Sequence, residues 1–131
     1  MSEHEVWRPI PGHEGKHEVS NFGRIRSCNR VVIRSNGTVY TVHGRILNPA
    51  VDKDGYMQIA LKGSGKKDTA VKVHRAVALA FIPNELGKSE VNHINGNRSD
   101  NRVENLEWCT RSENLLHSYR VLRGIVQRRV G

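Results

Sequence analysis

One histidine and three asparagines in the C-terminal half of the sequence have residue types suited to hydrolysing a phosphodiester bond. His93 directly follows Asn92, and two further asparagines, Asn105 and Asn114, follow downstream. Hydrolysis at neutral pH needs a base that deprotonates water and a positive charge that meets the charge developing on the phosphate. Histidine, which titrates near neutral pH, suits the first role, and a hard divalent cation held by side-chain oxygens suits the second. We therefore expect a metal-dependent site around these four residues.

Short elements must hold these side chains in place. Residues 91–109 predict two short strands around a long polar loop, and Thr110 and Glu113 form a capping box that begins a helix. We expect this helix to continue through Leu122 and to end near Gly124. Because neighbouring side chains of a strand diverge, Asn92 and His93 should point to opposite sides, so one can hold metal while the other addresses water.

Upstream of this unit, the apolar residues of segment 73–81 recur at helical spacing. They predict a short helix over residues 74–81, which Pro83 stops. His74 lies at the start of this helix, where we interpret it as a capping or packing histidine and not as a catalyst.

Period-two alternation and turn signals predict antiparallel β structure in the first half of the chain. The turns are expected at residues 21–23, 36–37 and 54–55, with short strands on either side. The predicted fold class is α+β: a small N-terminal antiparallel β-sheet, then a short helix and a C-terminal ββα unit. We predict a boundary between an N-terminal DNA-binding region, residues 1–73, and a nuclease region, residues 74–131.

The charge of the chain indicates a polyanionic partner. Its 131 residues carry 21 Lys and Arg against 13 Asp and Glu, a net charge of +8, and 37% of the residues are apolar. A protein this basic most often binds nucleic acid, although a basic, solvated surface is the alternative.

Several classes of protein are disfavoured by the sequence. Cys28 and Cys109 are too far apart for a zinc-ligand pair, which argues against a structural zinc module. No stretch approaches the roughly 18 apolar residues of a membrane helix. Without a signal-peptide pattern at the N-terminus, we expect a cytoplasmic protein with reduced thiols and no membrane partner.

Three segments in combination resemble a known nuclease motif. Residues 91–97 read Val-Asn-His-Ile-Asn-Gly-Asn, residues 105–108 read Asn-Leu-Glu-Trp, and residues 113–114 read Glu-Asn. Together they resemble the HNH motif of the ββα-metal (His-Me finger) superfamily, in particular its phage and intron homing endonucleases.

The resemblance extends upstream to about residue 5. Residues 7–12 and 18–27 are similar to the DNA-binding module that commonly precedes this nuclease, and residues 55–56 and 73–81 fit the segment that joins the two.

The resemblance implies a role for each member of the site. His93 would be the general base that activates water, and Asn105 would tie the long loop so that His93 is oriented. Asn114 would bind the metal through its amide oxygen, in place of the motif's last histidine. Asn92 matches the position that is Asp or His in many relatives and binds the metal. One divalent cation is implied, Mg²⁺ ahead of Mn²⁺, and no small-molecule cofactor is expected.

Basic side chains on the predicted strands, hairpin loops and C-terminal helix are expected to bind double-stranded DNA. A β-ribbon can enter the major groove, where most basic residues would contact phosphates and position the protein. The predicted DNA-binding residues are Arg24, Arg26, Arg30, Arg34, Arg45, Lys62, Lys66, Lys67, His117, Arg120 and Arg123.

Two functions remain open at this point. The first is a site-specific DNA endonuclease, a monomer or weak homodimer, that nicks or cuts both strands. The second is a DNA-binding protein on the same scaffold that cleaves weakly or not at all. We keep this alternative because Asn92 occupies the position that is a metal-binding Asp or His in many relatives. Taken alone, Asn95, Asn97 and Asn101 are interpreted as turn residues and not as catalysts, because asparagine is common in turns. Asn95 and Asn97 are expected only to turn the chain.

Overall fold

The N-terminal part of the chain consists of short antiparallel strands, as predicted, divided among three small sheets. The structure, a computed structural model, describes residues 4–62 and 68–122. The four-stranded sheet has the order β1-β2-β3-β6, and a three-stranded sheet has the order β7-β8-β9. The strands of these two sheets are β1 (Trp7–Pro9), β2 (His17–Ser20), β3 (Ile25–Ser27), β6 (Ile46–Leu47), β7 (Ala50–Val51), β8 (Met57–Lys62) and β9 (Asp68–Lys72).

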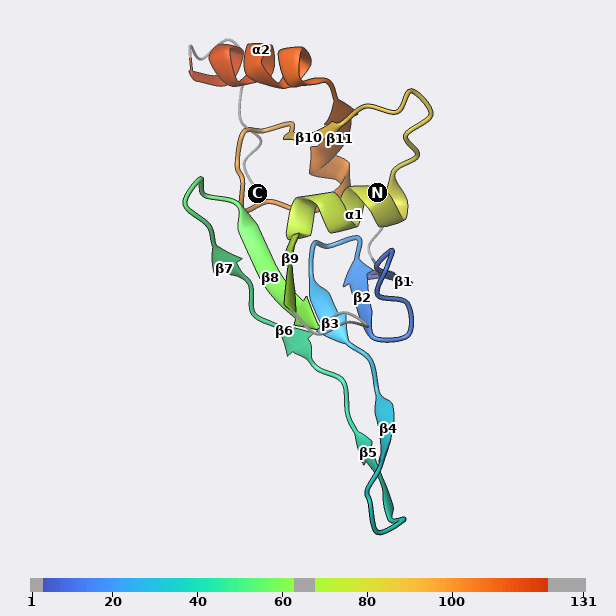
Figure 1. Ribbon diagram of the computed structural model, residues 1–131. Helices are drawn as coiled ribbons and strands as arrows, with labels where there is room; N and C mark the ends of the chain where they lie inside the picture. The colour runs from blue at the N-terminus through green and yellow to red at the C-terminus, as the bar shows by residue number, and fades with distance from the viewer. Residues whose placement is uncertain (1–3, 63–67, 123–131) are drawn as a thin grey trace.

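The third sheet is a hairpin that extends away from the rest of the molecule (Figure 1). It pairs β4 (Arg30–Ile33) with β5 (Val39–Val42) around a turn in which Gly37 has φ of 87°. Glycine suits this turn because a positive φ strains other residues. Val31, Ile33 and Val39 are exposed on the hairpin, so it owes little of its stability to the core.

Helix α1 (Val73–Phe81) lies between the N-terminal sheets and the C-terminal unit (Figure 1). Val73 and Val77 are fully buried on its inner face, where they join Val19 and Leu61 of the sheets and Leu106 of the C-terminal unit in one core. The packed core therefore crosses the predicted boundary at residue 73, and the division into two regions there stays a prediction.

The C-terminal unit has the predicted ββα order. Strand β10 (Glu90–His93) pairs with β11 (Leu106–Cys109) across a loop that ends in a single 3-10 turn, η1 (Val103–Asn105), and α2 (Arg111–Leu122) follows. The α+β fold class is thereby confirmed. In the described ranges, no helix is long and apolar enough to cross a membrane.

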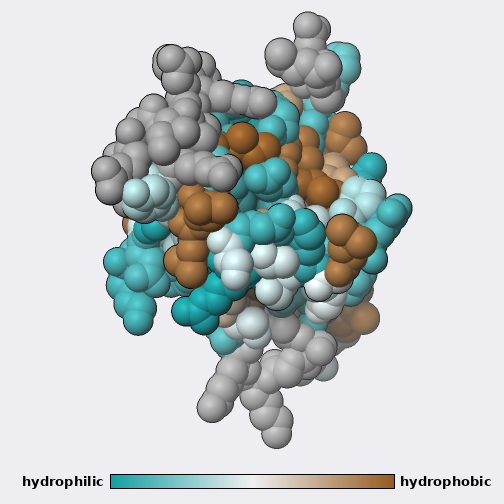
Figure 2. Space-filling view, turned by 90° about the horizontal axis from the view of Figure 1, so that it is seen from above, coloured by the Kyte–Doolittle hydropathy of each residue, from teal (hydrophilic) through white to brown (hydrophobic). Residues whose placement is uncertain are grey.

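The capping box of α2 is confirmed at both of its bonds. The Glu113 side chain accepts from the Thr110 backbone N–H at 2.9 Å, and the Thr110 hydroxyl accepts from the Glu113 N–H at 3.1 Å. Seen from above, the α2 end of the molecule presents hydrophobic residues among hydrophilic ones (Figure 2). Leu115 and Leu116 of α2 are at least half exposed, so its outer face packs on no described element.

Candidate active site

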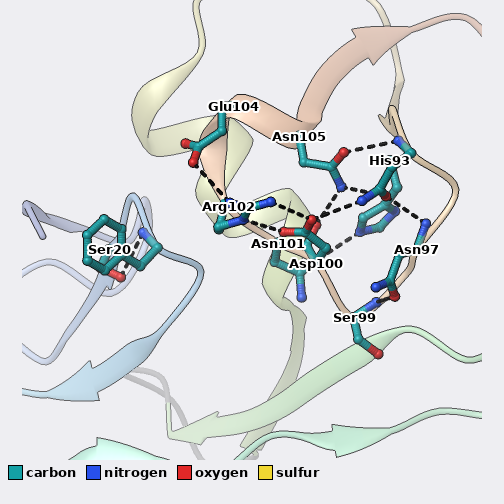
Figure 3. Close-up of polar contacts among 11 residues, drawn as sticks. Ser20, His93, Asn97, Ser99, Asp100, Asn101, Arg102, Glu104 and Asn105 are labelled. Atoms are coloured by element: carbon teal, nitrogen blue, oxygen red, sulfur yellow. Dashed lines mark hydrogen bonds and ion pairs between the residues drawn. The ribbon is translucent and has the colours of Figure 1, made fainter. Parts of the chain in front are cut away.

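His93 ends strand β10 and is buried, with 5% of its surface exposed. Its Nε2 atom lies 2.7 Å from the amide oxygen of Asn101, and both side chains point into the same loop (Figure 3). Because an amide oxygen can only accept a hydrogen bond, Nε2 carries the proton and donates it to Asn101. The lone pair is then on Nδ1, so His93 is held in the tautomer that can take a proton from water.

The His93 ring packs against two other rings. His74 of α1 lies 5.0 Å from it between ring centroids, and Tyr56 lies 6.0 Å away and stacks on His74 at 5.0 Å. Burial lowers the pKa of His93, and it lowers the pKa of His74 to about 3, because a charged imidazole is poorly solvated there. Both rings are therefore neutral at neutral pH, which is the state that a general base needs.

His74 packs in the site and does not cap its helix. The N-cap of α1 is Lys72, and the helix has no side-chain cap. The Nδ1 atom of His74 is buried without a hydrogen-bond partner among the described residues. The packing part of the prediction for His74 is confirmed, but the sequence did not indicate that the residue would contact His93.

Asn105 ties the loop between the two strands, as predicted. It is completely buried, and its amide nitrogen donates to the Asn95 side-chain oxygen at 3.0 Å and to the Asp100 carbonyl at 2.8 Å. Its amide oxygen accepts from the Asn95 backbone N–H at 3.0 Å. All three bonds close the loop on itself, and none of them joins Asn105 to the His93 side chain.

Two asparagines have larger roles than the turn assignment gave them. Asn101 is the direct partner of His93, and Asn95 forms a reciprocal pair with Asn105 while donating to the Asp100 carboxylate at 3.0 Å. The expectation that Asn95 only turns the chain was wrong, because burial within a folded loop cannot be seen in composition. The sequence did not indicate that Asn101 would contact His93. Asn97 does form a turn, in which its side chain accepts from the Ser99 N–H at 3.0 Å.

The two predicted metal ligands each lie beside a carboxylate. The Asn92 amide nitrogen donates to Glu107 at 3.0 Å across the β10–β11 pair, and the Asn114 amide nitrogen donates to Glu90 at 3.0 Å. Within the described ranges, no three His, Cys, Asp or Glu side chains gather as a metal-binding group. The available donors are instead amide oxygens with carboxylates next to them, an all-oxygen set that fits a hard divalent cation.

His117, one turn after Asn114, holds α2 to the end of β10. Its Nε2 atom lies 2.7 Å from the Ile94 carbonyl, and because a carbonyl only accepts, this nitrogen is the donor. The contact is structural, and DNA binding by His117 stays a prediction.

Arg98 is a basic residue near the site that sequence reasoning missed. Its guanidinium lies 4.7 Å from the centroid of Tyr56, and it donates a hydrogen bond to the Asp54 carbonyl. Its positive charge also contributes to lowering the pKa of His93. The Arg98 side chain is exposed, which leaves its guanidinium accessible to an anionic ligand close to His93. The only sequence signal for it was a positive charge in the loop.

The first predicted turn, residues 21–23, packs on the loop of the site. The Val103 N–H donates to the Asn21 carbonyl at 2.9 Å, and Gly23 lies against Asn101. The N-terminal strands thus support the same loop that holds His93.

The five predicted DNA-binding arginines of the N-terminal half divide into two groups. Arg24 is ion-paired with Glu5, and Arg26 is ion-paired with Glu18 at 2.7 Å. The remaining three, which are exposed on or just after the β4–β5 hairpin, are Arg30, Arg34 and Arg45. The structure does not describe the side chains of Lys62 and Arg120, and Lys66, Lys67 and Arg123 lie outside the described residues.

Both halves of the chain match known protein families. Residues 5–62 match the NUMOD4 motif, and residues 71–116 match the family described as HNH endonuclease. An uncharacterized HNH endonuclease of Acanthamoeba polyphaga mimivirus is 40% identical over 118 residues, which are 87% of this chain and 26% of that protein. The DNA endonuclease I-HmuI of Bacillus phage SP01 is 36% identical over 109 residues, which are 83% of this chain and 55% of that protein.

A solved structure supports the same relationship. It concerns DNA binding and cleavage by the HNH homing endonuclease I-HmuI, and it matches with a TM-score of 0.66 and 33% identity. The match covers 91% of this chain and 59% of that one, so this chain spans between about a quarter and somewhat more than half of the length of these relatives. Residues 71–116 therefore belong to the HNH endonuclease family and follow a NUMOD4 motif, which confirms the family that the sequence resembled.

Proposed function

We propose that this chain is a divalent-metal-dependent DNA endonuclease of the homing type, in which His93 activates the attacking water. The observation that carries the proposal is the bond from His93 Nε2 to the Asn101 amide oxygen, which leaves Nδ1 as the base. Burial keeps the ring neutral, and Asn105 keeps the loop closed behind it.

In the proposed reaction, Nδ1 of His93 takes a proton from water as the water oxygen bonds to phosphorus. The bond between phosphorus and the leaving oxygen then breaks. The positive charge that develops on the imidazole is stabilised through Nε2 by Asn101, and the proton later passes to solvent or to the leaving oxygen. In the proposal, Arg98 would bind a phosphate, which is supported by the effect of its charge on the pKa of His93.

HNH endonucleases generally depend on a divalent cation. Asn92 and Asn114 would hold it through their amide oxygens, and when bound it would supply the positive charge that offsets the charge on the phosphate and the leaving oxygen. Mg²⁺ is the ion that we propose, with Mn²⁺ as a substitute.

Double-stranded DNA is the proposed substrate for two reasons. The net charge of +8 favours a polyanion, and the exposed β4–β5 hairpin carries Arg30 and Arg34 on a two-stranded ribbon of the kind that enters a major groove. One site per chain suits a monomer that nicks one strand in each binding event, and a weak homodimer would be needed for concerted cleavage of both strands.

The test compares plasmid nicking and DNA binding in the same preparations. We expect supercoiled plasmid to be nicked with Mg²⁺ or Mn²⁺ and not with EDTA. We expect His93→Ala to abolish nicking while a gel mobility shift of the DNA is retained. Retained binding without any metal-dependent nicking by the wild-type protein would contradict the proposal and favour a DNA-binding protein that does not cleave.

A further inference from the structure

Both predicted metal ligands are primary amides, and each is held by a carboxylate from a different strand. Asn92 donates its Nδ2–H to Glu107 of β11, and Asn114 of α2 donates its Nδ2–H to Glu90 of β10, each at 3.0 Å. The β10–β11 strands and α2 lie next to one another at one end of the molecule (Figure 1). The same arrangement therefore occurs twice, once for each proposed ligand of the metal.

We propose that Glu90 and Glu107 are positioning residues that direct the amide oxygens of Asn114 and Asn92 toward the divalent cation. This inference rests on the proposed function, because it assumes that these amides hold a metal.

The first argument is orientation. A primary amide has one end that can bind a cation, the oxygen, and one end that can only donate hydrogen bonds, the nitrogen. Rotation of the amide by half a turn would present the nitrogen to the metal. A carboxylate only accepts hydrogen bonds, so it keeps the nitrogen beside it and leaves the oxygen at the opposite end. Glu107 and Glu90 thus select the rotamers of Asn92 and Asn114 that can bind metal.

The second argument is charge. A neutral amide brings no negative charge to a cation, whereas an aspartate at the position of Asn92 would bring one. Among the described residues, neither Glu90 nor Glu107 forms an ion pair with a basic side chain. Within the described part of the chain, their charge is therefore not neutralised by an ion pair, and in our proposal it polarises the two amides and attracts the cation. Carboxylates behind metal ligands commonly raise affinity on the order of 10–100-fold.

The third argument is register. Asn92 and Glu107 are directly paired in the β10–β11 ladder, and Glu90 precedes Asn92 by one strand period. The three side chains therefore share one face of the strand pair. Glu113, by contrast, is engaged by the capping box and by Lys88 at 3.0 Å, so it is not available for this role.

The experiment measures cation binding directly. Mn²⁺ binding is followed by electron paramagnetic resonance. All variants are made in the His93→Ala background, so that the short mixed-sequence DNA duplex added to the protein is not cleaved. The signal of Mn²⁺ with the duplex alone is subtracted. Glu107→Gln and Glu90→Gln are compared with Glu85→Gln, an exposed carboxylate in the loop before β10. We expect the first two to weaken Mn²⁺ binding on the order of 10–100-fold and the third to leave it unchanged.

A rescue variant separates positioning from a merely structural role. In Asn92→Asp, the ligand carries its own charge and both of its oxygens can bind metal. We expect Glu107→Gln to have little effect on Mn²⁺ affinity in this background, because the glutamine amide introduced at position 107 can donate to the new carboxylate. Glu90→Gln should still weaken Mn²⁺ binding in the Asn92→Asp background, because Glu90 acts through Asn114.

The outcomes distinguish the two proposals. Mn²⁺ affinities of Glu107→Gln and Glu90→Gln equal to that of Glu85→Gln would overturn the positioning role, even if the wild-type protein nicks DNA. Equal losses from Glu107→Gln with and without the Asn92→Asp substitution would overturn it for Glu107. If wild-type protein neither nicks DNA nor binds Mn²⁺, the proposed function itself fails. Thermal melting of each variant shows whether a loss of binding reflects unfolding.

Discussion

Gly23 lies directly against Asn101, the residue that holds the ring of His93. A Cβ atom at position 23 would lie 2.8 Å from the Asn101 carbonyl oxygen, and Gly23 has φ of +88°. The contact joins a turn of the NUMOD4 motif to the loop of the HNH site, beside the hydrogen bond from the Val103 N–H to the Asn21 carbonyl.

We predict that Gly23→Ala lowers the nicking rate more than it lowers DNA affinity, because the new methyl group must displace Asn101. Gly15→Ala is the matched control, since Gly15 has φ of +79° and nothing within 4 Å of an added Cβ. Both variants carry backbone strain of roughly 1–3 kcal/mol. Nicking and mobility-shift assays test the prediction, and equal losses of nicking in the two variants would show that the contact with Asn101 is unimportant.

Asn101→Ala should reduce the nicking rate by roughly 10²-fold, the typical contribution of a well-placed general base. The substitution removes the acceptor for the Nε2–H of His93, so the ring loses the bond that selects its tautomer. Asn97→Ala, in the exposed part of the same loop, serves as the control and should keep most of the activity. Equal nicking by Asn101→Ala and the wild type would refute the role of Asn101.

His74 makes stability depend on pH in a defined direction. Burial lowers its pKa from the ordinary value of 6.5 to about 3 in the folded protein, so the unfolded chain binds more protons below pH 6.5. The stability that follows from keeping His74 neutral is present above pH 6.5 and is lost as the pH falls toward 3. At about pH 5, this loss amounts to about 2 kcal/mol.

Between neutral pH and about pH 5, we therefore expect the free energy of unfolding of His74→Leu to fall by about 2 kcal/mol less than that of the wild type. This expectation holds whatever the substitution does to stability at neutral pH. Urea denaturation at neutral pH and at about pH 5 measures the difference for both proteins. His43→Leu, at an exposed position between β5 and β6, is the control and should leave the profile as it is. An identical pH dependence in wild type and His74→Leu would show that His74 is not the group responsible.

The hairpin arginines should contribute to DNA affinity through phosphate contacts. Arg30→Ala is expected to reduce the slope of log affinity against log salt concentration by about 0.9, as for the loss of one phosphate contact. Arg24→Ala should change the slope less, because Arg24 is already paired with Glu5. Fluorescence anisotropy with a labelled duplex at several salt concentrations measures both slopes. A larger change for Arg24 than for Arg30 would place the DNA on the β1–β3 strands instead.

Much of the architecture was determined by the sequence itself. Alternating apolar residues and turn residues predicted the strands on either side of residues 21–23 and 36–37, and antiparallel strand pairs lie on either side of both turns. The Thr110 and Glu113 pair predicted the start of α2. These features depend on backbone preferences and on contacts between residues close in the chain, which a sequence records directly.

The partners of each site residue were decided only by the tertiary structure. The spacing of His93, Asn105 and Asn114 indicated the family, but it could not distinguish Asn101 as the partner of His93 from the other asparagines of the loop. Contacts of His93 with His74 and of Asn114 with Glu90 join residues that are distant in the chain. Such contacts exist because α1 and α2 pack against the β10–β11 pair, and burial then determines which polar groups must pair with each other.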